Sequence, residues 1–360
     1  MFQDKDLQRT PLSEIGEFGM IDRIQSSFKN TQPTTQLGIG DDCAIIDYGE
    51  KAMLISTDML TEGVHFNLAY VPLKHLGYKA IASSVSDVCA MNALPQQVLV
   101  SFAVSDRFPV EAIDELFAGM LIACQKYEVD LVGGDTTASK AGLVINVTAI
   151  GSCDKEKIVT RKGARENDLL VVSGDLGSAY FGLQILEREN EVYKVNPNVQ
   201  PDLRPYDYLI GRQLKPEARL DIIKLLEKLN VKPTAMIDVS DGLASEILHL
   251  SQQSKVGFTL DEEKIPLDQQ VISAGEEFEL NASIAALNGG EDYELLFTIK
   301  QEDYDKIKGN PHFTVIGFAN DLQAGNHLVA RGSNIKIPLT SQGWDAFYQY
   351  QKNVKNAEEE

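Results

Sequence analysis

The sequence predicts an α/β protein built from two domains. Its 360 residues are more than one hydrophobic core usually organises, and both halves mix segments with strand and helix spacing. Near residue 155 the character of the chain changes, because a dense basic segment interrupts an acidic protein. We therefore expect an N-terminal domain over residues 1–154, a C-terminal domain over residues 155–348 and a disordered tail over residues 349–360.

The overall composition excludes several classes of partner. Hydrophobic residues make up 43% of the chain, which is ordinary for a globular protein, but 53 acidic residues oppose 33 basic ones and give a net charge of −20. This balance argues against a nucleic acid or an anionic membrane surface as partner. No apolar run approaches ~18 residues, and residues 1–6 lack the features of a signal peptide.

The cysteines point to a reducing compartment. Cys43, Cys89, Cys124 and Cys153 are scattered without CxxC spacing. We expect buried free thiols in the cytoplasm and no metal–thiolate site.

Residues 38–66 hold the first cluster of candidate site residues. A tight turn around Gly49 would pair two short strands and bring Asp42 near Ser56, Thr57 and Asp58. Carboxylates forced together repel one another unless a cation lies between them, and hard oxygen ligands suit Mg²⁺ or Ca²⁺. Two ordinary polar loops would be the simpler explanation of one such cluster. The motifs in the rest of the chain are needed to distinguish a metal site from such loops.

The rest of the first half alternates helices and strands. We expect a helix around residues 20–28 and a longer one over residues 73–93, in which Asp87 stands among apolar neighbours. A carboxylate in such surroundings is unfavourable unless it is paired or bound to metal. Strands are expected at 98–104, 129–132 and 143–151, with a helix at 110–127 and the turn sequence GGDTT at 133–137.

The second half continues the mixture. A strand at 169–172 leads into a turn at 173–177 that resembles a nucleotide-binding glycine loop without the full GxGxxG spacing, and a helix begins near Ser178. We expect a surface excursion over residues 188–205 and a helix over residues 216–229. Asp238 and Asp241 precede a further helix, where helix capping would explain one of them but not both. Strands are expected over 295–298, 314–317 and 335–337.

Six aspartates thus lie at element ends or in apolar surroundings: Asp42, Asp58, Asp87, Asp135, Asp238 and Asp241. Each alone is more often a cap or a turn residue than a ligand. Together, beside glycine-rich turns and without a catalytic triad, they indicate a site for several Mg²⁺ ions that holds a polyphosphate.

Seven motifs in order carry a family resemblance. They are GIGDDCA (38–44), LISTDMLTEGVHF (54–66), SVSDVCAMNALP (84–95), GGDTT (133–137), TRKGAR (160–165), IDVSDGLASE (237–246) and NGGEDYELLFT (288–298). The series resembles the bacterial thiamine-monophosphate kinases, a family of the aminoimidazole ribonucleotide synthetase superfamily, over about residues 16–348. One departure is Asn92, where the family usually has glycine; no ligand is lost by it.

The resemblance implies a fold and an activity. The fold is the two-domain aminoimidazole ribonucleotide synthetase-like one, with an N-terminal mixed sheet that pairs across a homodimer and a nucleotide between the domains. The activity is the ATP- and Mg²⁺-dependent phosphorylation of thiamine monophosphate to thiamine diphosphate, with release of ADP, by direct in-line transfer.

The resemblance also implies roles for individual residues. The matched Mg²⁺ ligands are Asp42, Ser56, Thr57, Asp58, Asp87, Asp135, Asp238 and Asp241. The matched ATP contacts are Gly134, Asp135, Arg161 and Ser240, and the matched thiamine-phosphate contacts are His65, Glu291 and Trp344. The chemistry fits, because arginine offers phosphate a fixed fork of donors and tryptophan offers a cationic thiazolium a flat face. The alternative is that these residues have structural roles only: a surface arginine, a capping glutamate and a core tryptophan.

No residue is expected to act as a general base. The acceptor is a phosphate monoester with a second pKa near ~6, so its attacking oxygen is already largely deprotonated at neutral pH. We therefore expect His65 to bind the substrate or orient a neighbouring group.

Two other functions compete with this one. An ATP-dependent synthetase of the same superfamily would activate an amide or acid oxygen, although the sequence lacks the C-terminal cysteine of the hydrogenase-maturation proteins and has no cysteine before Cys43, as selenophosphate synthetase would need. A non-catalytic Ca²⁺ module is hard to reconcile with ligands drawn from both halves of the chain.

Overall fold

The computed structural model describes residues 16, 19, 21–22, 25–26, 30–198 and 200–340. The tail expected over 349–360, the candidate Trp344 and most of the helix expected over 20–28 lie outside these residues. Among the described residues, no helix is both long and apolar enough to cross a membrane.

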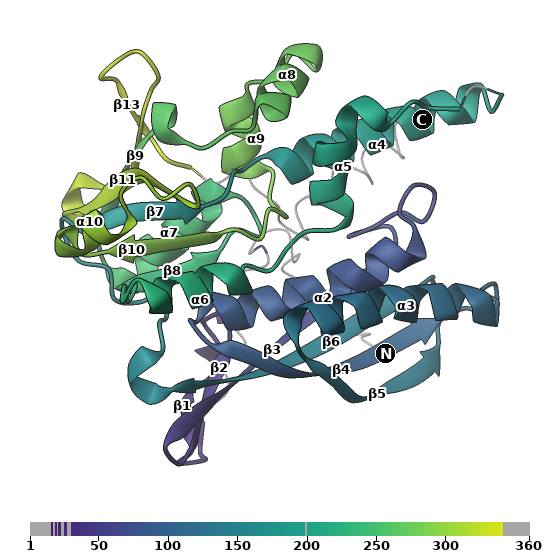
Figure 1. Ribbon diagram of the computed structural model, residues 1–360, viewed down its shortest axis with the longest axis horizontal. Coiled ribbons are helices and arrows are strands. Elements are labelled where there is room, and N and C mark those ends of the chain that lie inside the picture. Colours follow the sequence, from purple (N-terminus) through teal and green to yellow (C-terminus); the bar gives the residue numbers. More distant parts are fainter. Residues whose placement is uncertain are drawn as a thin grey trace, which may run out of the picture.

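The first half of the chain forms a six-stranded sheet covered on one face by two helices (Figure 1). The strands lie in the order β1-β2-β3-β6-β4-β5, and all neighbours are antiparallel except β4 and β5. Their bounds are β1 Thr35–Leu37, β2 Ala44–Tyr48, β3 Lys51–Thr61, β4 Leu94–Val104, β5 Asp130–Ala138 and β6 Val144–Asp154. The covering helices are α2, Leu73–Ala90, and α3, Val110–Tyr127. The tight turn predicted at Gly49 joins β2 to β3 and confirms their pairing.

The second half forms a seven-stranded sheet in the order β13-β12-β9-β11-β7-β10-β8, where only β12 and β9 are parallel. The strands are β7 Leu169–Ser173, β8 Ala235–Asp238, β9 Gly257–Asp261, β10 Leu295–Ile299, β11 Phe313–Asn320, β12 His327–Val329 and β13 Lys336–Pro338. The helices are α4 Ser178–Val195, α5 Asp207–Leu214, α6 Leu220–Lys228, α7 Leu243–Ser254, α8 Gln269–Glu277, α9 Ala282–Asn288 and α10 Tyr304–Ile307. Two mixed sheets with helices confirm the predicted α/β class. The boundary predicted after residue 154 falls at the end of β6 and stays a prediction.

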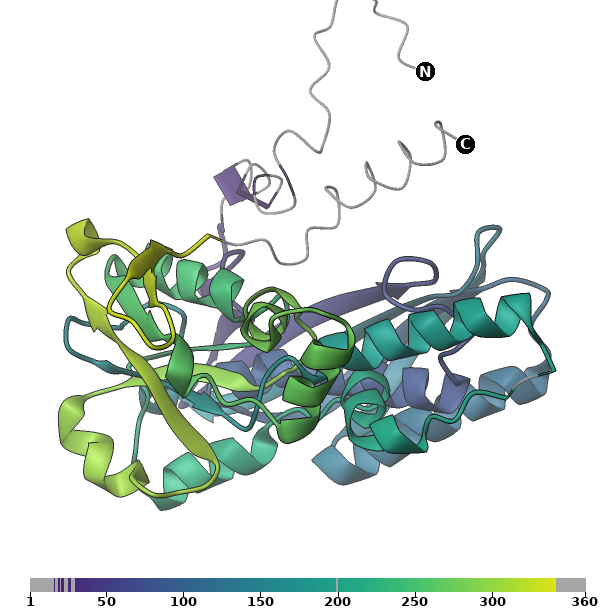
Figure 2. The same ribbon diagram turned by 90° about the horizontal axis from the view of Figure 1, so that it is seen from above.

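Helix α2 is the centre of the molecule. It contacts α3 at a reciprocal pair of glycines: a Cβ on Gly77 would lie 2.0 Å from the Leu116 carbonyl oxygen, and a Cβ on Gly119 would lie 1.8 Å from that of Lys74. Its other neighbours are the first sheet, α5, α6 and β8, and α4 and α5 reach back over it (Figure 1, Figure 2). Nearly every residue of α2 from Leu76 onward is therefore buried, so each polar side chain it carries needs a partner.

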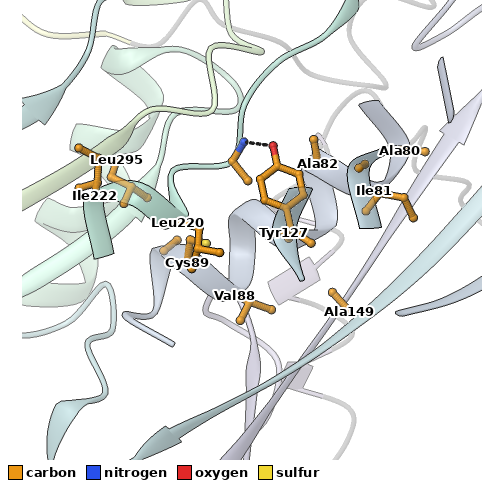
Figure 3. Close-up of a cluster of buried hydrophobic side chains, with 14 of the residues drawn as sticks. Ala80, Ile81, Ala82, Val88, Cys89, Tyr127, Ala149, Leu220, Ile222 and Leu295 are labelled. Atoms are coloured by element: carbon orange, nitrogen blue, oxygen red, sulfur yellow. Dashed lines mark hydrogen bonds between the residues drawn. The ribbon is translucent and has the colours of Figure 1, made fainter. Parts of the chain in front are cut away.

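The two halves share one hydrophobic core at this helix. Ile81, Val88 and Cys89 of α2 belong to the same buried cluster as Leu220 and Ile222 of α6 and Leu295 of β10 (Figure 3). Close beside them, the hydroxyl of Tyr127 accepts a hydrogen bond from the Ala218 backbone N–H at 2.9 Å. Because packed interiors resist deformation, site residues from the two halves are held in a fixed relation.

Two predicted segments in the second half are wrong. The excursion expected over residues 188–205 is helical in its first part, because α4 continues to Val195 and ends just before the Asn196-Pro197 step, where helix geometry is disfavoured. The helix expected over residues 216–229 begins only at Leu220, and a separate helix, α5, precedes it.

Candidate active site

Three carboxylates from distant parts of the sequence meet at one point. Asp42 lies just before β2, Asp87 near the end of α2 and Asp238 at the end of β8, and each offers an oxygen within 4.8 Å of the others. All three are predicted metal ligands, and the structure brings them together from both halves of the chain. We call them the carboxylate cluster.

The cluster is electrostatically unfavourable by itself. Burial, and then repulsion from Asp58, raises the pKa of Asp87 well above its usual value. Burial, and then the charge of Asp42, raises the pKa of Asp238 to about 7. A cation among these groups would remove the repulsion, and a donor set made only of carboxylate and hydroxyl oxygens is the kind that Mg²⁺ prefers. The residues present therefore fit magnesium.

Hydroxyl groups of β3 and α2 hold the carboxylates in place. The Ser56 hydroxyl donates to Asp87, the Ser84 hydroxyl donates to Asp58 at 3.0 Å, and the Ser86 hydroxyl donates to Asp238 at 2.5 Å. Neither α2 serine is among the predicted site residues, although three closely spaced serines in a buried helix were a signal for them.

Thr57 differs from its neighbours because side chains alternate along a strand. Its hydroxyl donates to the Val147 carbonyl at 3.2 Å and lies 3.1 Å from the Thr148 hydroxyl on β6. The structure therefore does not bring the Thr57 side chain to the carboxylate cluster.

Arg161 connects the predicted ATP contacts to the predicted metal ligands. Its Nη2 lies 2.6 Å from one oxygen of Asp42 and its Nε lies 3.3 Å from the other. Its backbone N–H donates to the carboxylate of Asp41 at 3.2 Å, a residue that the sequence analysis did not select. Burial, followed by the charge of Asp42, raises the pKa of Asp41 to about 7.

Gly134 and Asp135 lie in β5 itself, whereas the sequence analysis ended that strand at residue 132. A Cβ on Gly134 would lie 1.7 Å from the Val100 carbonyl oxygen, so the close pairing of β4 and β5 requires glycine there. Asp135 is exposed, and its carboxylate accepts the Thr136 N–H at 2.9 Å. It lies outside the group of three that forms the carboxylate cluster.

Ser240 and Asp241 belong to the turn between β8 and α7, and buried Glu246 holds that turn in shape. The Glu246 carboxylate accepts the Asp241 N–H at 3.0 Å and the Ser240 hydroxyl at 3.5 Å. Burial, and then the nearby charge of Asp241, raises the pKa of Glu246 well above its usual value. A glutamate in the first turn of a helix after Ser-Asp was the available signal for this residue.

Glu291 and His65, the two described residues predicted to contact thiamine phosphate, lie close enough to influence each other. The pKa of His65 is lowered, chiefly because the ring is buried. The charge of Glu291 opposes this lowering, and the charge of Lys79 adds to it. The Nδ1 of His65 accepts the Thr61 N–H at 3.0 Å, which places the proton of the neutral ring on Nε2. Trp344, the third predicted contact, lies outside the described residues.

The glycine turn over residues 173–177 is not open to a phosphate. The carboxylate of Asp292 accepts the N–H groups of Gly177 at 2.7 Å and Ala179 at 3.4 Å. These are the donors that an anion would use at the start of α4, so the chain's own carboxylate takes that place.

The fold agrees with the comparisons. Residues 40–153 match the family model described as AIR synthase related protein, N-terminal domain. The thiamine-monophosphate kinase of Aquifex aeolicus is 37% identical over 337 residues, which cover 93% of this chain and 99% of that protein. The Bacillus subtilis thiamine-monophosphate kinase is 34% identical over 320 residues, covering 87% and 94%.

A solved structure of AaThiL complexed with AMPPCP and TMP superposes with a TM-score of 0.78 at 34% identity, covering 95% of this chain and 99% of that one. The chain belongs to the thiamine-monophosphate kinase family. Asn92, the one departure noted from the family's motifs, has a φ of 57°. Asparagine tolerates this left-handed conformation better than most residues, which explains why it can stand where glycine is usual.

We predict that the carboxylate cluster makes the metal-free protein sensitive to pH. A carboxyl group with a raised pKa in the folded state holds its proton more tightly there than in the unfolded chain. Its contribution to stability therefore falls as pH rises from ~4 towards ~7. Without Mg²⁺, the Tm should fall between about pH 4 and about pH 7. Asp87→Asn should reduce this fall, raise the Tm at the upper pH and lower activity by orders of magnitude.

Thermal unfolding with and without Mg²⁺, together with activity, checks this. Asp202→Asn is the matched control, because Asp202 is exposed and pairs with Arg204 of its own segment at 2.8 Å. Near-normal turnover of Asp87→Asn at saturating Mg²⁺ would remove Asp87 from the site.

Proposed function

We propose that this protein transfers the γ-phosphoryl group of ATP to thiamine monophosphate, giving thiamine diphosphate and ADP by direct in-line transfer. Family membership over nearly the whole chain carries the proposal. The carboxylate cluster supports it, because a site that joins two polyanions has to neutralise charge.

The chain's own residues would divide the work by position. The carboxylate cluster, with Ser56 and Asp58, would hold Mg²⁺, and Asp135 and Asp241 are the further proposed ligands. The Thr57 hydroxyl, which bonds to β6, would not be among them. When bound, the metal would offset the negative charge that builds up on the phosphates. The proposed ATP contacts are Gly134, Asp135, Arg161 and Ser240.

Arg161 could bind either a carboxylate or a phosphate. Its guanidinium now binds both oxygens of Asp42, and its forked donors are equally suited to phosphate. We propose that Arg161 exchanges Asp42 for a phosphate of ATP when the metal occupies the cluster.

The acceptor needs no general base in this proposal, because its phosphate oxygen is already deprotonated at neutral pH. The residues at the acceptor end would bind and orient thiamine monophosphate. Glu291, His65 and Trp344 are the proposed contacts.

We further propose a homodimer formed through the first sheet. Met59 of β3 and Leu131 and Val132 of β5 are large apolar side chains that are 57%, 41% and 58% exposed. Strand β5 is a sheet edge that is exposed along nearly its whole length, and such edges invite pairing. We also place the protein in the cytoplasm, which suits its four buried free cysteines.

The direct test of the proposed reaction is a product assay. Purified protein with ATP, Mg²⁺ and thiamine monophosphate should yield thiamine diphosphate and ADP in equal amounts. Turnover of ATP with a carboxamide substrate and no diphosphate would show that the reaction is that of a superfamily synthetase instead.

His65→Asn tests the absence of a general base. We expect a higher KM for thiamine monophosphate and a kcat within about tenfold of the wild type, the pattern of lost ground-state binding. The measurement is steady-state kinetics on a variant shown to be folded. A kcat reduced by ~10³ with an unchanged KM would identify His65 as a base, and lost stability with unchanged kinetics would make its role structural.

The dimer is tested by mass. Light scattering at micromolar concentration should give twice the mass of the chain, and introducing a charge with Val132→Glu should shift the protein towards monomer. A monomeric wild-type mass would contradict the proposal.

A further inference from the structure

Both carboxylate oxygens of Glu291 are held by the protein. Lys79 of α2 places its Nζ 2.6 Å from one oxygen, and Gln213 of α5 donates from Nε2 to the other at 2.7 Å. The backbone of Glu291 is fixed as well, because its N–H donates to the Ser240 carbonyl at 2.6 Å and its φ is 58°. Such positive φ values are uncommon for a residue with a side chain and persist only where the surroundings enforce them.

Lys79 is buried far more deeply than an ordinary lysine. Its side chain is 4% exposed, against 27% for Glu291, and its Nζ also lies 3.5 Å from the Gln213 carbonyl oxygen. A buried ammonium is strongly unfavourable without a partner, so Lys79 depends on the Glu291 carboxylate as its counter-charge. Because the pair joins α2 to the loop before β10, it also links the two halves of the chain.

This pairing determines what Glu291 can offer a ligand. The positive charge of Lys79 already neutralises the carboxylate, so the pair as a whole adds little negative charge to attract the cationic thiazolium. The remaining lone pairs of an oriented carboxylate are still good acceptors. Glu291 is thus better suited to accept a hydrogen bond from a neutral N–H group than to act as a counter-ion.

The position of Lys79 on α2 relates Glu291 to the carboxylate cluster. Lys79 precedes Asp87 by eight residues on the same helix, which corresponds to ~12 Å along its axis. One rigid, buried helix therefore separates the group that would recognise the base from the groups that would hold the phosphates. This separation suits a substrate with its ring system at one end and its phosphate at the other.

We propose that Lys79 is a positioning residue, which fixes Glu291 as a hydrogen-bond acceptor for the amino group of the substrate's aminopyrimidine ring. The inference rests on the function proposed above and adds to it the specificity for the ring. It assigns Gln213 the same supporting role on the second oxygen.

The test replaces the ammonium by an apolar group of similar length. Lys79→Met should raise the KM for thiamine monophosphate about tenfold or more, which is the size expected for a hydrogen bond to a charged group. The KM for ATP should stay unchanged and kcat should stay within about threefold, because the phosphates are bound elsewhere. The preference of the wild type for thiamine monophosphate over its 4-oxo analogue, which lacks the amino group, should fall by a similar factor.

Lys126→Met is the matched control. Lys126 also forms an ion pair that joins the two halves, with Glu217, but the described partners of the Glu291 carboxylate are Lys79 and Gln213. Its kinetics should equal those of the wild type.

A double-mutant cycle separates positioning from direct contact. If Lys79 acts through Glu291, the KM of Lys79→Met/Glu291→Gln should be no higher than that of Glu291→Gln alone. Additive effects would mean that Lys79 itself contacts the substrate. An unchanged KM for thiamine monophosphate in folded Lys79→Met would also overturn the inference. A lower KM would overturn it too, and would indicate that Glu291 acts as a counter-ion.

Two further measurements keep the test decisive. If Lys79→Met does not fold, Gln213→Met should raise the same KM and weaken the same preference, and unchanged values would contradict the inference. A wild-type protein that makes no thiamine diphosphate would refute the proposed function, whereas an active wild type with kinetically unaltered variants would refute the positioning role alone.

Discussion

Repulsion among three buried carboxylates is the constraint around which this structure is arranged. Asp42, Asp87 and Asp238 come from a loop, a helix and a strand end, and their oxygens lie within 4.8 Å of one another. Folding places them together although their charges oppose it, and the hydrophobic core shared by the two halves holds them there. The carboxylate cluster therefore lowers the stability of the folded, metal-free protein, as is common at functional sites.

Helix α2 connects the carboxylate cluster to the rest of the site. One end of the helix supplies Asp87 and the serines that orient the carboxylates, and two turns earlier it supplies Lys79, the partner of Glu291. The burial of α2 explains why Ser84, Ser86 and Lys79 each have a hydrogen-bonding or ionic partner. The same packing argues that any change on ligand binding is local, such as the release of Arg161 from Asp42, and not a hinge between the halves.

The sequence was sufficient for those parts of the structure that local patterns determine. The bounds of α3, the β2–β3 hairpin and the meeting of Asp42 with Asp87 and Asp238 follow from periodicity, turn residues and motifs. The end of α4 did not follow, because a polar helix that continues to a proline resembles a loop in sequence. The start of α6 did not follow either, because Pro216, a residue type common in the first helical turn, lies four residues before the helix. Lys79 was missed because a buried charge is recognisable only when its partner, distant in sequence, is known. Glu246 was missed although its place in the first helical turn after Ser-Asp was a signal, since its partners are near it in the sequence.

Metal binding at the carboxylate cluster is the central claim, and a crystal structure with Mn²⁺ in place of Mg²⁺ tests it most directly. Manganese prefers the same oxygen ligands and can be located by its anomalous scattering. We predict an anomalous peak within ligand distance of Asp42, Asp87 and Asp238, with the Arg161 guanidinium displaced from Asp42. Crystals grown in saturating Mn²⁺ with no peak there, and with the Arg161–Asp42 ion pair intact, would contradict the account.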